Sequence, residues 1–277
     1  MTDTPDASNL PAQGTPPGAP PGAPPVAADG FDYLHSPTWR IFRILSEFVD
    51  GFTFLAGIQR SVTFFGSARL PESDRYYQAA RELGRRLAAA GFTIVTGGGP
   101  GIMQAGNQGA AEGSGPTGER SVGLNIQLPH EQRINPYVRK GWSFHYFFSR
   151  KVMLDYSAEA YVFFPGGFGT LDEFFELTTL IQTGKMERTV PIVLIGGEYW
   201  APLIEWMRGV LLNRFQTIAP ADLGIWTLTD DLNEAVHIIE QGVQHRIKQR
   251  VASTGREHCT PDEKLNQATH PMSGSEQ

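Results

Sequence analysis

The 277-residue sequence contains one cysteine and lacks any apolar run long enough to span a bilayer. Because Cys259 has no second cysteine to pair with, an intrachain disulfide is impossible, and nothing points to an oxidising compartment. No apolar stretch approaches the ~20 residues that a membrane helix needs, and no secretory leader pattern opens the chain. We therefore expect a cytoplasmic protein that has no membrane partner.

An excess of basic residues is also absent. The 23 lysines and arginines are outnumbered by 29 aspartates and glutamates, which gives a formal net charge of -6. The field of such a chain does not attract a nucleic-acid polymer or an anionic membrane surface. Any phosphate-binding site must therefore be local, and we expect a small molecule as the partner.

Several patterns that bind cofactors or metals are missing. The run GGGPGI at 97–102 does not fit the dinucleotide motif GxGxxG in any register, and the nucleotide-binding pattern GxxxxGK[ST] does not occur. His130 and Glu131 do not continue to HExxH, and the seven histidines show no ligand spacing. Ser67 does not lie in a GxSxG turn. The sequence therefore predicts no metal site and no bound cofactor.

The two ends of the chain differ in composition from its middle. Residues 1–35 are rich in proline, glycine and alanine, and residues 249–277 are polar. Such segments bury too little apolar surface to offset the entropy lost on ordering. We expect two disordered tails, at 1–35 and 249–277, around a single domain over 36–248.

That domain opens with an apolar helical pattern. Ser36 suits a helix cap and Pro37 the first helical position, and apolar residues then recur at helical spacing. The helix carries more apolar residues than a solvent-facing helix needs. It packs either on its own domain or in a subunit interface, and we expect a homodimer or a higher homo-oligomer.

Strand and helix patterns alternate along the rest of the domain. The expected strands are 61–65, 92–96, 121–126, 160–164, 190–195 and 225–228, and the expected helices are 73–90, 102–112, 148–156, 171–183, 200–212 and one from 231. This alternation predicts an α/β fold, a Rossmann-like, doubly wound, mostly parallel sheet with helices on both faces. Ligands of such sheets bind at the carboxyl ends of the strands.

The stretch FFPGGFGTLDE, from Phe163 to Glu173, is the most informative. An apolar strand enters a glycine-rich turn, and a helix begins near Leu171. Backbone N–H groups at a helix start have no partners within the helix, and the helix dipole attracts an anion such as phosphate. The glycines of the turn let that anion approach the main chain. Turns of this kind also join strands to helices without any ligand, so the turn alone is weak evidence.

Other polar motifs fall at the same edge of the predicted sheet. The first strand is followed by GSAR (66–69), the second by GGGPG (97–101) and the third by PHE (129–131). The helix that carries Arg150 and Lys151 also begins there, because it follows the third strand. These segments are therefore expected to converge with the PGGFGT turn on one crevice.

Five motifs in this order resemble the Lonely Guy (LOG) family. These phosphoribohydrolases release the base from cytokinin nucleotides and were long described as lysine decarboxylases. The matching segments lie within about residues 38 to 215, and they are GSAR, GGGPGIM, LPHEQ, the Arg150–Lys151 pair with Met153, and PGGFGTLDE, which fits PGGxGTxxE. The segment WRIFRILSEFVDGF resembles an extension of the longer LOG subclass, which is associated with oligomers larger than the dimer.

The resemblance implies roles for particular residues. Arg150 and Glu173 match the catalytic pair, in which the carboxylate stabilises positive charge on the ribose and orients water. The implied substrate is AMP or an N6-modified AMP, cleaved to a free base and ribose 5-phosphate. The implied substrate contacts are Gly66, Ser67, Gly98, Gly99, Gly101, Met103, Glu131, Lys151, Gly166, Gly167, Gly169, Thr170 and Thr179.

Two other functions stay open at this point. A carrier of the same fold would bind a nucleotide or a pterin-like cofactor without cleaving it, and it would not require the Arg150 and Glu173 pair. A pyridoxal phosphate decarboxylase would need a lysine for a Schiff base, and only Lys151 is plausibly placed. The aromatic cluster at 142–148 either flanks the base of a nucleotide or packs in the core.

Overall fold

The computed structural model describes residues 37–127 and 134–254. The chain divides into two compact units, Met1–Ile41 and Phe42–Gln277, and the account below concerns the second. The predicted tail at 1–35 lies outside the described residues, as does the predicted tail from 255 onward. Helix α7 (Leu232–Thr254) continues past position 249, where the sequence predicted the end of the domain.

Within the described residues, seven strands form one sheet, in the order β4-β3-β2-β1-β5-β6-β7. All neighbouring strands run parallel. The strands are β1 (Ser61–Phe65), β2 (Thr93–Thr96), β3 (Ser121–Ile126), β4 (Lys140–Phe144), β5 (Ala160–Phe163), β6 (Ile192–Leu194) and β7 (Thr227–Leu228). The predicted α/β fold with a Rossmann-like parallel sheet is confirmed.

Strand β4 is the one strand that the sequence did not predict. Its segment KGWSF begins with exposed residues and has no run of apolar residues. It is a strand because all five of its residues pair with β3, from Val122 opposite Lys140 to Ile126 opposite Phe144. The partner strand therefore supplies the structure that local propensity does not.

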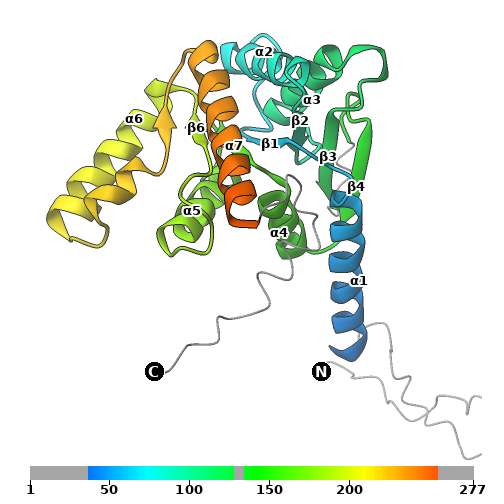
Figure 1. The fold of residues 1–277 in the computed structure, drawn as a ribbon, viewed down its shortest axis with the longest axis horizontal. Coiled ribbons are helices and arrows are strands. Elements are labelled where there is room, and N and C mark those ends of the chain that lie inside the picture. The colour runs from blue at the N-terminus through cyan, green and yellow to red at the C-terminus, as the bar shows by residue number, and fades with distance from the viewer. Residues whose placement is uncertain (1–36, 128–133, 255–277) are drawn as a thin grey trace, which may run out of the picture. The chain divides into compact units, whose positions relative to one another are not determined.

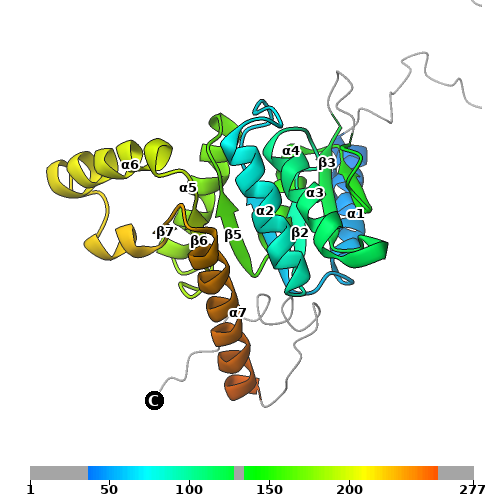
Figure 2. The ribbon, with the colours of Figure 1, turned by 90° about the horizontal axis from the view of Figure 1, so that it is seen from above.

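Helices cover both faces of the sheet (Figures 1 and 2). One face packs against α2 (Arg75–Ala89), α3 (Ile102–Gly113) and α7 through a core that includes Val62 and Phe64 of β1. The other face packs against α4 (Phe147–Ser157), α5 (Phe168–Gln182) and α6 (Gly197–Trp206) through a core that includes Phe65. Because side chains alternate along a strand, neighbouring residues of β1 serve different cores.

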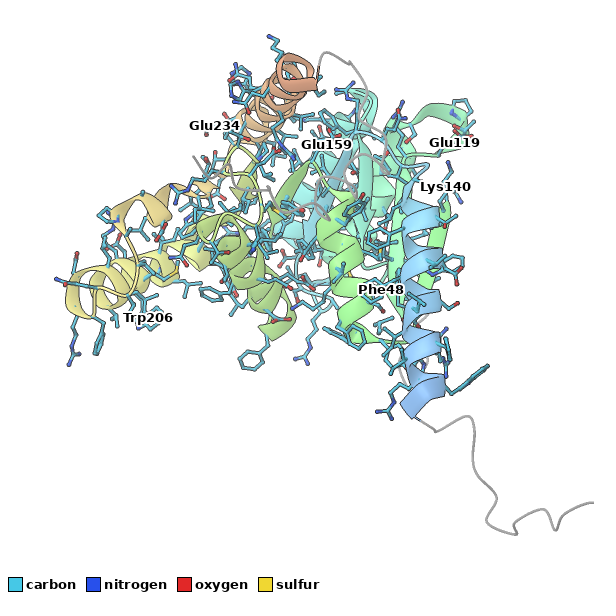
Figure 3. All side chains as sticks on the ribbon, turned by 60° about the horizontal axis from the view of Figure 1, so that its bottom comes forward. Phe48, Glu119, Lys140, Glu159, Trp206 and Glu234 are labelled. Atoms are coloured by element: carbon cyan, nitrogen blue, oxygen red, sulfur yellow. The ribbon has the colours of Figure 1, made fainter. Side chains whose placement is uncertain are left out.

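Helix α1 (Pro37–Leu55) packs only part of its apolar surface on its own domain. The Phe48 ring lies 6.5 Å from that of Phe148 on α4 between centroids, and Figure 3 shows Phe48 on the side of α1 that faces α4. Phe42, Leu45 and Val49 are more than half exposed. Packing on its own domain therefore accounts for one side of the helix, and burial of the other in a subunit interface stays a prediction.

Helix α5 begins at Phe168, three residues before the predicted start at Leu171. Glycine disfavours helix in isolation, which is why the sequence placed Gly169 in the turn. The earlier start puts Gly169 and Thr170 in the first helical turn, so their backbone N–H groups belong to the helix N-terminus. Among the described residues, no helix is both long and apolar enough to cross a membrane.

Candidate active site

A cleft of about 890 Å³ opens at the carboxyl edge of the sheet, around the ends of β1, β2 and β5. Loop residues after these strands form its wall together with residues of α4 and α5. Nine residues of the predicted site line it, namely Gly66, Ser67, Met103, Arg150, Gly166, Gly167, Gly169, Thr170 and Glu173. Segments that follow β1, β2 and β5 therefore meet around one cavity, as the sequence predicts, whereas the expected segment at 129–131 lies outside the described residues.

Backbone hydrogen bonds join three of the glycine-rich loops. The Ser67 N–H donates to the Pro165 carbonyl at 3.0 Å, and the Ile102 N–H donates to the Ser67 carbonyl at 3.0 Å. Gly101 has a φ of +67° and no room for a side chain, because a Cβ there would collide with the Ser67 carbonyl. The loops after β1, β2 and β5 thus form one connected rim, which requires glycine at that contact.

Gly98 and Gly99, in the loop after β2, are hydrogen-bonded to Asn135. The Gly98 carbonyl accepts from the Asn135 N–H at 2.9 Å, and the Gly99 carbonyl accepts from the Asn135 amide at 3.0 Å. Neither glycine lines the cleft, and nor does Gly101. Their described contacts are structural, and direct contact of these three glycines with a substrate stays a prediction.

Arg150 is fixed from two sides. Its Nε donates to the Leu124 carbonyl at 3.0 Å, and its guanidinium lies 5.6 Å from the centroid of the Phe147 ring. Burial lowers the pKa of Arg150, whereas the nearby charge of Glu173 raises it. An arginine stays protonated in a protein, so the site holds a fixed cation beside the cleft.

Gly97 makes room for that cation. A Cβ at this position would lie 2.6 Å from a guanidinium nitrogen of Arg150 and 2.8 Å from the Met103 sulfur. The sequence places the GGGPG run at the ligand-binding edge, but the resemblance implies substrate contacts only for Gly98, Gly99 and Gly101. The useful signal was position, because Gly97 directly follows β2 at the edge where ligands bind.

A Gly97→Ala substitution is expected to displace Arg150 and to slow catalysis by about 10-fold or more, since small misplacements of reacting groups are costly. The measurement is the turnover rate on the substrate proposed below. Gly209→Ala is the matched control, because an added Cβ there meets nothing within 4 Å. Equal rates for the two variants would contradict the placement of Arg150 against Gly97.

The N-terminus of α5 differs from those of three other helices. Asp74 caps α2, the Glu47 carboxylate accepts from backbone N–H groups just before α4, and Asp230 accepts from Gly196 and Gly197 at the start of α6. At α5 the cap residue is Gly167, and no side chain of the described residues caps it. This helix end therefore retains its positive potential at the cleft, where a phosphate would be stabilised.

Glu173 lies one helical turn further along α5 and is 6% exposed. Its Oε2 is buried and has no hydrogen-bond partner among the described residues. Burial raises the pKa of Glu173 to about 7, and Glu176 and Asp172 add to the rise, while Lys151 and Arg150 oppose it. A carboxylate with this pKa is only partly ionised near neutral pH and is suited to take or give a proton.

Lys151, a predicted substrate contact, points elsewhere. Its Nζ lies 2.7 Å from Asp172 Oδ2 and 2.7 Å from Glu176 Oε2, and it does not line the cleft. Burial by itself lowers the pKa of Lys151, but the two carboxylates raise it above its ordinary value. A Schiff base requires a neutral amine, so this geometry disfavours a pyridoxal phosphate decarboxylase.

Two further predicted contacts lie away from the cleft or outside the structure. Thr179 is exposed, and its hydroxyl donates to the Phe175 carbonyl within α5 at 2.7 Å. Glu131 lies outside the described residues. Their contacts with a substrate stay predictions.

The aromatic cluster divides between the two predicted roles. Phe144 is fully buried in the core, and Trp142 packs against it. Phe147 is half exposed and lines the cleft beside Arg150. A flat apolar surface at this position is suited to the ring of a nucleotide base.

Comparisons with known proteins agree with the motifs. A family model described as "possible lysine decarboxylase" matches residues 103–239. The chain is 31% identical over 146 residues to the rice (Oryza sativa subsp. japonica) protein named cytokinin riboside 5′-monophosphate phosphoribohydrolase LOG, which covers 51% of this chain. The chain spans only 57% of the length of that relative.

A bacterial relative is matched over more of its length. The cytokinin riboside 5′-monophosphate phosphoribohydrolase of Rhodococcoides fascians is 27% identical over 185 residues, with 65% of this chain and 89% of that protein covered. Among solved structures, the molybdenum cofactor carrier protein of Chlamydomonas reinhardtii is 21% identical, with a TM-score of 0.49 and coverage of 66% of this chain and 98% of the carrier.

Proposed function

This chain belongs to the LOG family, and from that premise we propose that it hydrolyses the N-glycosidic bond of nucleoside 5′-monophosphates. The substrate class is AMP or an N6-modified AMP, and the products are the free base and ribose 5-phosphate. The observation that carries the proposal is the position of Glu173 in the same cleft as Arg150 and the start of α5: among the described residues, its buried Oε2 has no hydrogen-bond partner and no side chain caps α5.

The phosphate of the substrate would bind at the N-terminus of α5. Gly167 and Gly169 leave open space there, because an added Cβ at either position would meet nothing within 4 Å. Backbone N–H groups and the helix dipole supply the attraction that the net negative charge of the protein does not. The phosphate takes no part in bond breaking, so its binding energy can be used to hold the ribose in place.

The ribose would then lie between the phosphate site and Glu173. Departure of the base builds positive charge on the ribose ring, and an ionised carboxylate beside that ring stabilises this charge. The same carboxylate orients the attacking water and accepts its proton. Arg150, on the α4 side of the cleft, would contact phosphate or ribose oxygens and assist departure of the base.

Incubation of the purified protein with AMP is expected to release adenine and ribose 5-phosphate, detected by chromatography. Adenosine, which lacks the phosphate, is expected to react at least about 100-fold more slowly, because phosphate binding supplies the energy that positions the sugar. N6-substituted AMP and other purine and pyrimidine monophosphates complete the panel.

The panel also tests the alternative function. A carrier of the same fold would return an intact nucleotide after long incubation, as judged by mass spectrometry of the bound ligand. Release of no base from any nucleoside monophosphate would therefore overturn the hydrolase proposal. A visible chromophore from bound pyridoxal phosphate, together with a product that depends on added lysine, would indicate the decarboxylase instead.

A further inference from the structure

A second buried carboxylate lies behind Glu173. Asp155, near the end of α4, is 8% exposed, and its Oδ1 has no hydrogen-bond partner among the described residues. Asp155, Glu173 and Glu176 each place a carboxylate oxygen within 4.8 Å of the others. Asp155 does not line the cleft. No sequence motif includes Asp155, although its spacing of four residues from Lys151 puts both on one side of α4.

Not all of these carboxylates can be ionised together at low cost. Two like charges at this separation repel strongly where water is excluded. Lys151 offsets the charges of Asp172 and Glu176 by direct contact, and Arg150 offsets part of that of Glu173. Among the described residues no cation forms an ion pair with Asp155, and the Tyr161 hydroxyl donates to its backbone carbonyl, not to its carboxylate.

We propose that Asp155 is a positioning residue for Glu173. Asp155 stays neutral, and its carboxyl O–H donates a hydrogen bond to the Glu173 carboxylate. Carboxylate oxygens of the two residues lie within 4.8 Å of each other, and Asp155 Oδ1 and Glu173 Oε2 both lack a hydrogen-bond partner among the described residues. This hydrogen bond would give a partner to both buried oxygens, and it would hold the other oxygen of the Glu173 carboxylate toward the cleft. This inference rests on the proposed function, in which Glu173 is the catalytic carboxylate.

The electrostatics agree with this division of roles. Burial raises the pKa of Asp155 to about 8, and the charge of Glu173 adds to that rise. The pKa of Glu173, raised to about 7 mainly by burial, is the lower of the two. While the pair shares one proton, Asp155 holds it, because the nearby charge of Arg150 stabilises the ionised form of Glu173. The other charged or titratable groups that act on the pair are Lys151, Arg150, Asp172, Glu176 and Tyr161.

A divalent cation is the competing occupant of the carboxylate cluster. Carboxylate oxygens are suitable ligands for Mg²⁺ or Ca²⁺. The Lys151 ammonium already lies 2.7 Å from Glu176 Oε2, so a positive group occupies one side of the cluster. The geometry therefore favours a shared proton over an ion.

The test is the pH dependence of base release from AMP for the wild type, Asp155→Asn and Asp155→Leu. The wild-type rate is expected to rise through about pH 7 as Glu173 ionises and to fall above about pH 8 as Asp155 loses its proton. The asparagine amide mimics the neutral acid and does not titrate, so Asp155→Asn should keep kcat within about 3-fold at pH 7.5 and lose the alkaline fall. Leucine has a similar size but no donor, and it should lower kcat about 10-fold without changing KM.

A readout that needs no catalysis separates this inference from the proposed function. Folded Asp155 keeps its proton up to about pH 8, whereas an unfolded aspartate loses it near pH 3.9. The folded protein therefore holds the extra proton in this window, and its stability falls as the pH rises. The Tm of Asp155→Asn relative to the wild type is expected to increase by at least about 3 °C from pH 5 to pH 8.

The outcomes are distinct. A wild type that releases no base at any pH, with the Tm difference as expected, overturns the proposed function but supports the carboxyl pair. Identical rate profiles for the wild type and Asp155→Asn, or a Tm difference that does not change with pH, overturn the role of Asp155. Stabilisation by millimolar Mg²⁺ or Ca²⁺ in the wild type but not in Asp155→Asn also overturns it, in favour of an ion site.

Discussion

Glu173→Gln is expected to slow base release from AMP by about 10²–10⁴-fold while leaving nucleotide binding nearly unchanged. Glutamine keeps the size of the side chain but carries no negative charge, so it neither stabilises charge on the ribose nor accepts a proton from water. The proposed phosphate site is built from backbone groups of residues 166–170, which the substitution does not touch. The measurements are kcat by chromatography of the released base and Kd for AMP by calorimetry.

Asp172→Asn is the matched control for this variant. Asp172 is the preceding residue of the same helix, its side chain is half exposed, and it does not line the cleft. Loss of its exposed ion pair with Lys151 has a small cost, so its turnover is expected within about 3-fold of wild type. If Glu173→Gln turned over as fast as Asp172→Asn, the assignment of the catalytic carboxylate would be wrong.

Arg150→Ala should lose about 10²–10³-fold in kcat/KM, the second-largest effect that the site predicts. The substitution removes the cation beside the cleft, its hydrogen bond to the Leu124 carbonyl and its contact with the Phe147 ring. Arg150→Lys keeps the charge but loses the planar fork of donors, and its rate is expected between those of alanine and wild type. Steady-state kinetics on AMP provides both numbers.

Arg208→Ala controls for the loss of an arginine as such. Arg208 is half exposed and pairs with Glu205 one helical turn away, and it does not line the cleft. Its activity and Tm are expected to match the wild type. An Arg150→Ala enzyme with the activity of this control would remove Arg150 from the catalytic machinery and would favour a carrier.

The fold followed from sequence because its signals are local. Each central strand is an apolar run and most helices begin or end at a cap or glycine, so the α/β alternation and the edge that carries the loops were predictable. Strand β4 was missed, because Lys140 to Phe144 becomes a strand only through pairing with β3. The predicted start of α5 was three residues too late, because glycine is typical of loops, whereas Gly169 lies in the first turn of the helix.

The site was predictable at the level of motifs but not of contacts. GSAR and PGGFGT were expected at one crevice, and both line the cleft. Lys151, adjacent to Arg150 in sequence, was assigned to the same crevice. Helix α4 turns the two side chains to different sides, so Arg150 faces the cleft while Lys151 pairs with carboxylates of α5.

By itself, the sequence determined the parallel sheet, the edge at which ligands bind, the glycine-rich start of α5 and the presence of an acid one turn beyond it. These features depend on periodicity and on backbone conformations that only some residues adopt. Tertiary structure alone decided that Asp155 lies close to Glu173, that Gly97 leaves space for Arg150 and that no described side chain caps α5. Each of these depends on distances between segments far apart in the chain and on the exclusion of water, which no local pattern encodes.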